Sequence, residues 1–261
     1  MHARRDVALT LRKLPYYVRS SLVLARLLQR RRDFVAVILR PSRTLHFDDG
    51  LVLRLRDRLD LLILKETLCD DVYGLADLVA PRFIVDVGAG VGSFAVVAAR
   101  RFPTCHILAF EPDPQQCILL RENAAANSIE VESVCMAIGT KSAYLLSGKG
   151  ARSSTVVHSD GGIFVPGVPL DEFIRGDTVD LLKIDCEGAE LDVLRSLSPL
   201  GLEHVARVAL EYHNFEGERQ DLMLGSFLRD AGYTVRVLPD PYSSDIGYLY
   251  ARRPEPVDAT S

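Results

Sequence analysis

The sequence predicts a doubly wound α/β fold, a mostly parallel sheet with helices on both faces. Three observations predict it. From Phe83 onward, short apolar runs alternate with helical patterns, which is typical of βαβ units. A glycine-rich turn joins the first apolar run to a helix. Only the residues PDPYSSD separate the last two strands, too few for a parallel crossover, so the final strand is expected to run antiparallel.

The expected strands of this sheet are short, and a helix is expected after each of the first five. Flanking turn residues and the change in hydrophobic period set their limits. In chain order they are Phe83–Val87, His106–Phe110, Val131–Met136, Val179–Ile184, Val205–Leu210, Thr234–Leu238 and Ile246–Tyr250.

The part before the sheet has its own pattern. Asp49-Gly50 between two alternating runs predicts a hairpin, and residues 59–68 read as helical. Residues 14–40 carry apolar side chains at helical spacing with arginines between them. We expect a basic amphipathic helical arm over residues 1–44, one domain over residues 45–252, and a frayed Pro-rich tail over residues 253–261.

Composition narrows the class of protein. The chain has 261 residues with 48% hydrophobic content, which suffices for a large core. Residues 1–58 hold 14 Lys and Arg against 5 Asp and Glu, whereas the remainder holds 17 against 30. An acidic body argues against nucleic acid as the main partner. The five cysteines show no paired spacing, so we expect buried free thiols, a reducing compartment and a cytoplasmic protein.

The turn after Val87 favours close approach of a ligand to the backbone. Gly88, Gly90 and Gly92 give the spacing G-x-G-x-G, and Ser93 stands where the dinucleotide fingerprint has its last small residue. Glycines at these positions let the chain turn sharply beside a ligand. The pattern alone indicates a nucleotide-containing ligand without saying which one.

Two carboxylates make the prediction more specific. Glu111 ends the second strand 21 residues past Gly90, where it can accept hydrogen bonds from both ribose hydroxyls. Pro112 begins a turn that leads the chain away from the ribose. Asp86 lies beside the glycine loop, where it would repel a pyrophosphate and attract a sulfonium with an α-ammonium group. These residues favour S-adenosylmethionine over NAD, although Asp86 bonded only to backbone amides remains an alternative.

With these motifs, the sequence resembles the FkbM-type S-adenosylmethionine-dependent methyltransferases. The matching motifs, over roughly Leu59 to Tyr250, are VDVGAGVGSF, FEPDP, AIG, PLDEFI, LLKIDCEGAELDVL and LEYH. The resemblance implies a class I methyltransferase (Rossmann-like) fold with a seven-stranded sheet, and O-methylation of a sugar, glycolipid or natural-product hydroxyl. It also implies that Asp86, Gly88, Gly90, Phe94 and Glu111 surround the cofactor, with Ala137 and Ile138 near its adenine.

A second acidic group is expected at the carboxyl ends of later strands, where open α/β sheets bind ligands. Asp185 ends one strand, and Glu187 follows on the turn. Glu211 and His213 lie two residues apart, so they point the same way from the next strand. We predict that His213 is the general base. Asp185 is expected to be catalytic and to contact the cofactor, Glu187 to be catalytic and to contact the acceptor, and Glu211 to bind the acceptor. A structural histidine is the alternative.

Further substrate contacts are expected from outside these motifs. Tyr73 is placed to close one side of the cleft, and Ser153 and Ser154 lie in a Gly- and Ser-rich loop. We predict no metal, although Asp185, Glu187 and Glu211 could together hold magnesium. The expected partner is a small or glycosylated acceptor; a membrane contact through the basic arm and a homodimer stay open. An NAD-dependent oxidoreductase and a non-catalytic cofactor-binding module are the rival functions.

Overall fold

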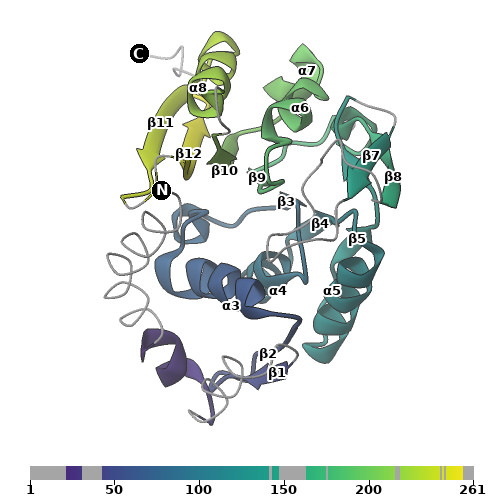
Figure 1. Cartoon of the computed structure of the whole chain (residues 1–261), viewed down its shortest axis with the longest axis vertical. Helices are drawn as coiled ribbons and strands as arrows, with labels where there is room; N and C mark the ends of the chain where they lie inside the picture. The colour runs from purple at the N-terminus through teal and green to yellow at the C-terminus, as the bar shows by residue number, and fades with distance from the viewer. Residues whose placement is uncertain are drawn as a thin grey trace, which may run out of the picture.

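The computed structural model describes residues 22–30, 43–140, 143–146, 163–174, 176–214, 218–241, 243 and 245–254. Within them a seven-stranded sheet crosses the molecule (Figure 1). Its strands in spatial order are β11 (Thr234–Pro239), β12 (Ile246–Arg252), β10 (Arg207–His213), β9 (Leu181–Ile184), β3 (Phe83–Val87), β4 (His106–Phe110) and β5 (Glu132–Val134).

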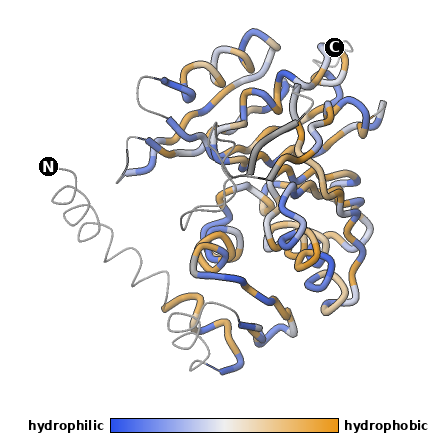
Figure 2. The backbone as a smooth tube through the Cα atoms, turned by 45° about the vertical axis from the view of Figure 1, so that its right-hand side comes forward, coloured by the Kyte–Doolittle hydropathy of each residue, from blue (hydrophilic) through white to orange (hydrophobic). Residues whose placement is uncertain are grey.

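The pairing directions confirm the predicted fold class. β5, β4, β3, β9 and β10 are parallel to one another, whereas β12 is antiparallel to both β10 and β11. Every side chain of β3 is buried, because helices cover both faces of a doubly wound sheet. Apolar stretches therefore run through the interior of the molecule, as Figure 2 shows.

Helices flank the sheet on two sides (Figure 1). One side carries α3 (Arg58–Lys65), α4 (Ser93–Arg101) and α5 (Pro114–Ala126), and the other carries α6 (Glu190–Arg195), α7 (Pro199–Glu203) and α8 (Gln220–Asp230). The carboxyl ends of the parallel strands thus meet along one edge between the two helix layers, which is the ordinary ligand position in such sheets.

The hairpin before the sheet forms as predicted. β1 (Arg43–His46) pairs antiparallel with β2 (Val52–Leu55), and Gly50 in the turn has a φ of 85°. Leu24 and Leu28 pack into the same apolar cluster as this hairpin and α3. Part of the segment expected to be a separate arm is therefore core, and a boundary at residue 44 would divide that cluster.

The helix after the hairpin begins at a well-formed cap. Asp57 accepts hydrogen bonds from the backbone of Leu59 and Asp60, while Asp60 accepts one from the backbone of Asp57. This reciprocal arrangement satisfies donors that a helix start leaves free. The helix continues as a π-helical turn, η1 (Glu66–Asp70), and a single 3₁₀ turn, η2 (Leu75–Asp77), precedes β3.

The segment after β5 differs from the expectation of a helix after each of the first five strands. Three short strands form a separate sheet there, in the order β6 (Ala137–Ile138), β8 (Ile163–Val168), β7 (Ala143–Leu146). A 3₁₀ turn, η3 (Leu170–Glu172), then leads toward β9. The apolar run of β8 pairs with its neighbours instead of making a crossover helix, a distinction that a short apolar run does not carry in its periodicity.

The cysteines also differ from the expectation of free thiols. Cys117 near the start of α5 forms a disulfide with Cys135 just after β5, whereas Cys69, Cys105 and Cys186 are free. The pair was not visible in the sequence because 18 residues separate the two cysteines and only the packing of α5 beside β5 brings them together. Among the described residues, no helix has the length and apolar character to cross a membrane.

Candidate active site

A cavity opens where β3, β4 and β9 end, and most predicted cofactor residues line it. Those that do are Gly88, Gly90, Glu111, Pro112, Ala137, Ile138 and Asp185. Glu187, which is predicted to contact the acceptor, lines the cavity as well. Pro112, Ala137 and Ile138 offer it an apolar wall, and Glu111 offers it a carboxylate. This combination fits a nucleoside, which presents a flat ring and a pair of ribose hydroxyls.

The glycine loop has the conformation that the sequence predicts. Gly88 and Gly90 have φ angles of 78° and 56°, in the left-handed region that favours glycine. A Cβ on Gly88 would lie 1.9 Å from the carbonyl oxygen of Asp185, so the ends of β3 and β9 touch there. Gly92 packs against Leu120 of α5 instead of lining the cavity. Ser93 is buried at the start of α4 and does not line it either.

Glu111 anchors the glycine loop through backbone hydrogen bonds. Its two carboxylate oxygens accept hydrogen bonds from the backbone N–H groups of Gly90 and Asp113, each at 2.8 Å. Burial raises the pKa of Glu111 to about 7, although both backbone donors act in the opposite direction. Each oxygen keeps a second lone pair, so the carboxylate can accept two ribose hydroxyls while it fixes the loop.

Replacing Glu111 with alanine should weaken binding of S-adenosylmethionine, the ligand that the sequence predicts, about 10- to 150-fold, because hydrogen bonds to a charged group typically contribute about 1.5–3 kcal/mol. Isothermal titration calorimetry with S-adenosylmethionine measures the change. Glu111→Gln is the matched control, since it keeps the shape and half of the acceptors. Equal affinity in all three proteins would remove Glu111 from the ribose site.

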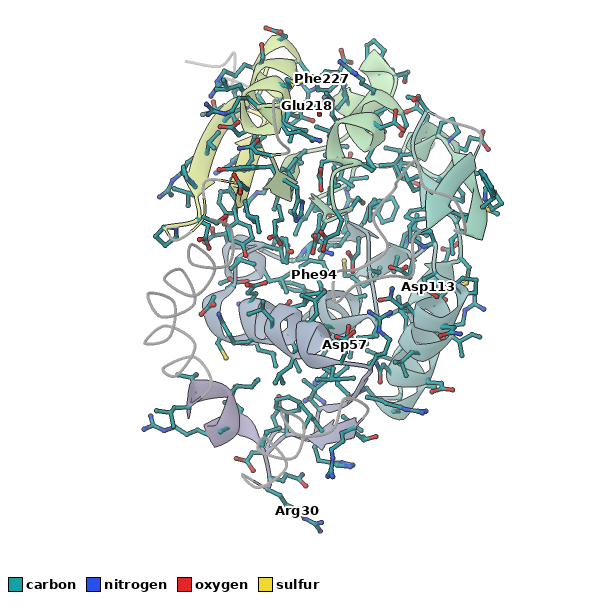
Figure 3. All side chains as sticks on the ribbon, in the orientation of Figure 1. Arg30, Asp57, Phe94, Asp113, Glu218 and Phe227 are labelled. Carbon is teal, nitrogen blue, oxygen red and sulfur yellow. A yellow bond between two sulfur atoms is a disulfide. The ribbon has the colours of Figure 1, made fainter. Side chains whose placement is uncertain are left out.

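One wall of the cavity comes from α3 and the chain just before it, a segment that the sequence analysis did not assign to the site. Arg56 and three residues of α3 line it (Leu59, Asp60 and Ile63). Arg56 Nε lies 3.2 Å from Asp57, and Arg56 Nη1 lies 3.8 Å from Asp113. The two aspartates cap the starts of α3 and α5, where Figure 3 labels them. The recurrence of apolar residues on one face of 59–68 was the signal available.

A buried ion pair lies under the glycine loop. Lys183 of β9 is 1% exposed; its Nζ lies 2.8 Å from Asp86 and donates to the carbonyl of Gly88 at 2.9 Å. The rings of Tyr73 and Phe94 lie 5.2 and 5.8 Å from the same Nζ. Burial lowers the pKa of Lys183, but Asp86 and Asp185 outweigh it and raise the pKa. The lone lysine in the apolar run LLKI was the signal that sequence reasoning passed over.

This ion pair changes the role expected for Asp86. The carboxylate is fully buried, does not line the cavity, and has no hydrogen bond from a neutral donor among the described residues. It faces Lys183 beneath the loop and does not reach the cavity, where the sequence analysis expects it to attract a sulfonium. Phe94 is likewise buried below the loop, against Tyr73. Both residues support the loop from beneath.

The second acidic group meets around His213, as the strand ends predict. The Nε2 atom of His213 lies 3.5 Å from Glu187 and 3.9 Å from Glu211. Its Nδ1 atom lies 3.1 Å from Glu190, a fully buried carboxylate that the sequence analysis left out. Asp185 joins this group from the end of β9 and also lines the cofactor cavity. We call these five residues the acceptor cluster, after the acceptor contact that the sequence predicts for Glu187 and Glu211.

The charges in the acceptor cluster determine its protonation. Burial lowers the pKa of His213, but Glu190, Glu211 and Asp185 outweigh burial and raise it to about 10. An imidazole with that pKa is protonated at neutral pH and has no lone pair to accept a proton. This differs from the base role expected for His213, and the physical reason is the number of carboxylates around one ring. Burial, with Asp185 and Glu66, raises the pKa of Glu211 well above its usual range.

Two tyrosines border the acceptor cluster. The hydroxyl of Tyr73 donates to Asp185 at 3.0 Å. Tyr73 is buried and does not line the cavity, so its predicted substrate contact stays a prediction. Its ring meets Tyr248 of β12 edge-on, with centroids 6.3 Å apart. The other two predicted substrate residues, Ser153 and Ser154, lie outside the described residues.

Three members of the acceptor cluster present potential metal ligands. One ligand atom each from Asp185, Glu211 and His213 lies within 4.8 Å of the others. A protonated imidazole is not a ligand, so a cation would first have to displace the His213 proton. The prediction that the site holds no metal stays a prediction.

Comparison with known proteins gives a consistent set of similarities. The family described as the methyltransferase FkbM domain matches residues 86–235. Methyltransferase sdnD of Sordaria araneosa is 28% identical over 215 residues, covering 66% of this chain and 82% of the relative. Methyltransferase 1 of Beauveria bassiana is 28% identical over 206 residues, covering 66% and 80%.

A solved structure supports the fold. The crystal structure of methyltransferase FkbM from Methylobacillus flagellatus aligns with a TM-score of 0.50 at 16% identity, covering 93% of this chain and 59% of that one. The similarity concerns the architecture of the sheet and its helices.

Proposed function

Because the chain belongs to the FkbM methyltransferase family, whose methyl donor is S-adenosylmethionine, we propose that it methylates a hydroxyl of a sugar, glycolipid or other natural product. One observation carries the proposal: Asp185 and Glu187 line the donor cavity and also belong to the acceptor cluster. An acceptor bound to these carboxylates therefore lies next to the donor.

The donor fits the cavity on observations of this structure. Gly88 and Gly90 present backbone without side chains, Glu111 presents two acceptor oxygens, and Ala137 and Ile138 present an apolar surface. When bound, S-adenosylmethionine supplies a methyl group already activated by its positive sulfur. The protein then has mainly to align the acceptor oxygen with that methyl group, and alignment alone contributes many orders of magnitude in favourable cases.

The carboxylates of the acceptor cluster suit a hydroxylated acceptor. Ionised carboxylates accept hydrogen bonds and do not donate them, so Asp185 and Glu187 can bind neighbouring hydroxyl groups of one substrate. The imidazolium of His213 lies between Glu187 and Glu211 and holds both in place, while Glu190 fixes the ring from the other side. His213 is therefore proposed as a positioning residue for the acceptor carboxylates.

Replacing His213 with alanine should lower turnover about 100-fold, because small misplacements of binding groups have effects of that order. The affinity for S-adenosylmethionine should stay nearly unchanged, since His213 does not line the donor cavity. Turnover at saturating acceptor and donor affinity by calorimetry are the two measurements.

Three other results of the His213 experiment have distinct meanings. Full turnover in His213→Ala would contradict the positioning role. Restoration of the variant by added imidazole would support the base role expected from the sequence. Loss of wild-type activity on chelation, restored by magnesium, would assign Asp185, Glu211 and His213 to a metal.

Two experiments test the function. The purified protein should show a higher melting temperature with S-adenosylmethionine and not with NAD, because a ligand that binds only the native state stabilises it. A panel of methyl glycosides and natural-product alcohols, incubated with methyl-labelled donor, should then yield a labelled methyl ether. Labelling of amines or thiols alone would contradict O-methylation.

The N-terminal segment supports a separate proposal about partners. Residues 1–58 carry a strong excess of arginine, and Leu22, Val23 and Leu27 of the described helix at 22–27 are exposed beside the buried Leu24 and Leu28. We propose that this surface contacts an anionic membrane or a second copy of the chain. Vesicle flotation and light scattering distinguish the two partners.

A further inference from the structure

The helix α3, which lines the donor cavity, continues toward Glu66, a carboxylate outside both that cavity's lining and the acceptor cluster. Leu59 and Ile63 line the cavity, and Glu66 follows three residues later, on the same side of the helix. Glu66 is also the first residue of the π-helical turn η1, a distortion that is frequent at functional sites. It lies before residues 86–235, so the family match does not include it.

The contacts of Glu66 connect it to the residues around the acceptor. Its carboxylate accepts a hydrogen bond from the hydroxyl of Tyr248. Tyr248 lies directly opposite Glu211 in the β10–β12 pair and edge-on to Tyr73, which donates to Asp185. Glu66 therefore lies within electrostatic range of both Asp185 and Glu211.

The charged groups around Glu66 come from each element packed against it. Lys65 and Asp70 lie next to it in the chain and pair with each other at 2.7 Å. Asp185 follows β9, Glu211 belongs to β10, Tyr248 belongs to β12, and Tyr73 precedes β3. Burial raises the pKa of Glu66 to about 7; Lys65 and the Tyr248 hydrogen bond lower it, and Asp185 and Asp70 raise it.

These surroundings separate Glu66 from the other titratable groups of the site. His213 has a pKa raised to about 10, so it keeps its proton at neutral pH. Burial and the neighbouring carboxylates raise the pKa of Glu211 well above its usual range, which favours its protonated form. A proton acceptor works best when its pKa lies near the working pH. Of Glu66, Glu211 and His213, Glu66 meets that condition.

We propose that Glu66 accepts the proton of the acceptor hydroxyl during methyl transfer, which adds to the proposed function a residue outside the family-matched segment. The acceptor oxygen forms a bond to the methyl carbon as the carbon–sulfur bond breaks. The electron pair of that bond goes to sulfur, which leaves neutral S-adenosylhomocysteine, and the hydroxyl proton goes to the Glu66 carboxylate. Charge balances, because one sulfonium and one carboxylate are neutralised together.

Glu66→Gln keeps the size of the side chain and an acceptor for Tyr248, but it no longer accepts a proton. Turnover with the acceptor found in the glycoside and alcohol panel should fall about 10²–10⁴-fold, with donor affinity unchanged. In the wild type, turnover should rise with pH through about 7 as Glu66 loses its proton, and Glu66→Gln should lack this rise. Added formate should restore part of the activity of Glu66→Ala.

The matched control is Glu122→Gln. Glu122 is an exposed carboxylate that pairs with Arg54, so its replacement should leave turnover and its pH dependence unchanged. A second measurement does not need an acceptor: ¹³C NMR of the Glu66 carboxyl, assigned by its absence in Glu66→Gln, should give a midpoint near 7 in the full-length protein. A midpoint near the usual glutamate value, or full turnover of Glu66→Gln, overturns the proposal. If the acceptor proves to be an amine while Glu66→Gln still abolishes the pH-dependent rise, the hydroxyl proposal fails and the role of Glu66 stands.

Discussion

Replacing Lys183 with methionine should lower the free energy of unfolding by about 3–5 kcal/mol, because removing one partner of a buried ion pair leaves the other charge uncompensated. The charge left behind is Asp86, which is fully buried 2.8 Å from Lys183 Nζ. The same ammonium group holds the carbonyl of Gly88, so the donor loop should lose order as well. Urea unfolding at neutral pH measures the stability, and calorimetry measures the donor affinity.

The loss should depend on pH with a definite sign. Burial already raises the pKa of Asp86 in the wild type, where Lys183 opposes the rise. Without Lys183 the folded-state pKa rises further above the unfolded value of about 3.9. The variant should therefore be least impaired below about pH 4 and should lose stability as the pH rises through the folded-state pKa.

A double variant tests the cause. Lys183→Met with Asp86→Asn removes both charges, so it should recover part of the stability that Lys183→Met loses. No recovery would mean that the packing of the lysine stem against Tyr73 and Phe94, and not the charge, is what Lys183 contributes. Equal stability of Lys183→Met and the wild type would contradict the ion-pair account altogether.

Replacing Gly88 with alanine should abolish measurable donor binding and methyl transfer. The new Cβ would lie 1.9 Å from the carbonyl oxygen of Asp185 and 2.8 Å from its carbonyl carbon, and neither atom belongs to a flexible side chain. The ends of β3 and β9 would have to separate, which displaces Gly90 from the donor cavity and Asp185 from the acceptor cluster. Calorimetry with S-adenosylmethionine and labelled methyl transfer are the measurements.

Gly176 provides the matched control for this substitution. Its φ of 79° equals that of Gly88 within a degree, and a Cβ there meets nothing within 4 Å. Gly176→Ala therefore carries the same left-handed strain, about 1–2 kcal/mol, without the collision. It should bind the donor normally. If the two alanine variants behave alike, backbone strain and not the contact with β9 explains the effect.

Much of the donor site could be predicted from the sequence because its parts lie close together along the chain. The glycine spacing and the position of Glu111 at the next strand end follow from one β–turn–α–β unit, and the loop contact between Gly90 and Glu111 is present as that unit requires. The resemblance to the FkbM family added Ala137 and Ile138, which line the cavity. The reversed last strand followed from the shortness of its connection.

The acceptor side was predictable only in part. That Asp185, Glu187, Glu211 and His213 meet follows from adjacent strand ends, but the protonation of His213 does not, since it depends on Glu190 and on burial. Asp86 shows the same limit: its place beside the loop was correct, yet its partner Lys183 is 97 residues away in the chain. The pairing of Cys117 with Cys135 also depends on the fold, which brings together cysteines 18 residues apart.

The sequence by itself determined the alternation of strands and helices, the glycine turn and the carboxylates at the strand ends, because hydrophobic period and backbone freedom are local properties. Only the tertiary structure decided which charges are buried together, since a pKa and an ion pair depend on neighbours that the fold supplies. It brought α3 over the donor cavity and Glu66 toward Asp185, although the apolar face of residues 59–68 by itself indicates only a packed helix. Burial beside distant side chains gives these residues their chemistry.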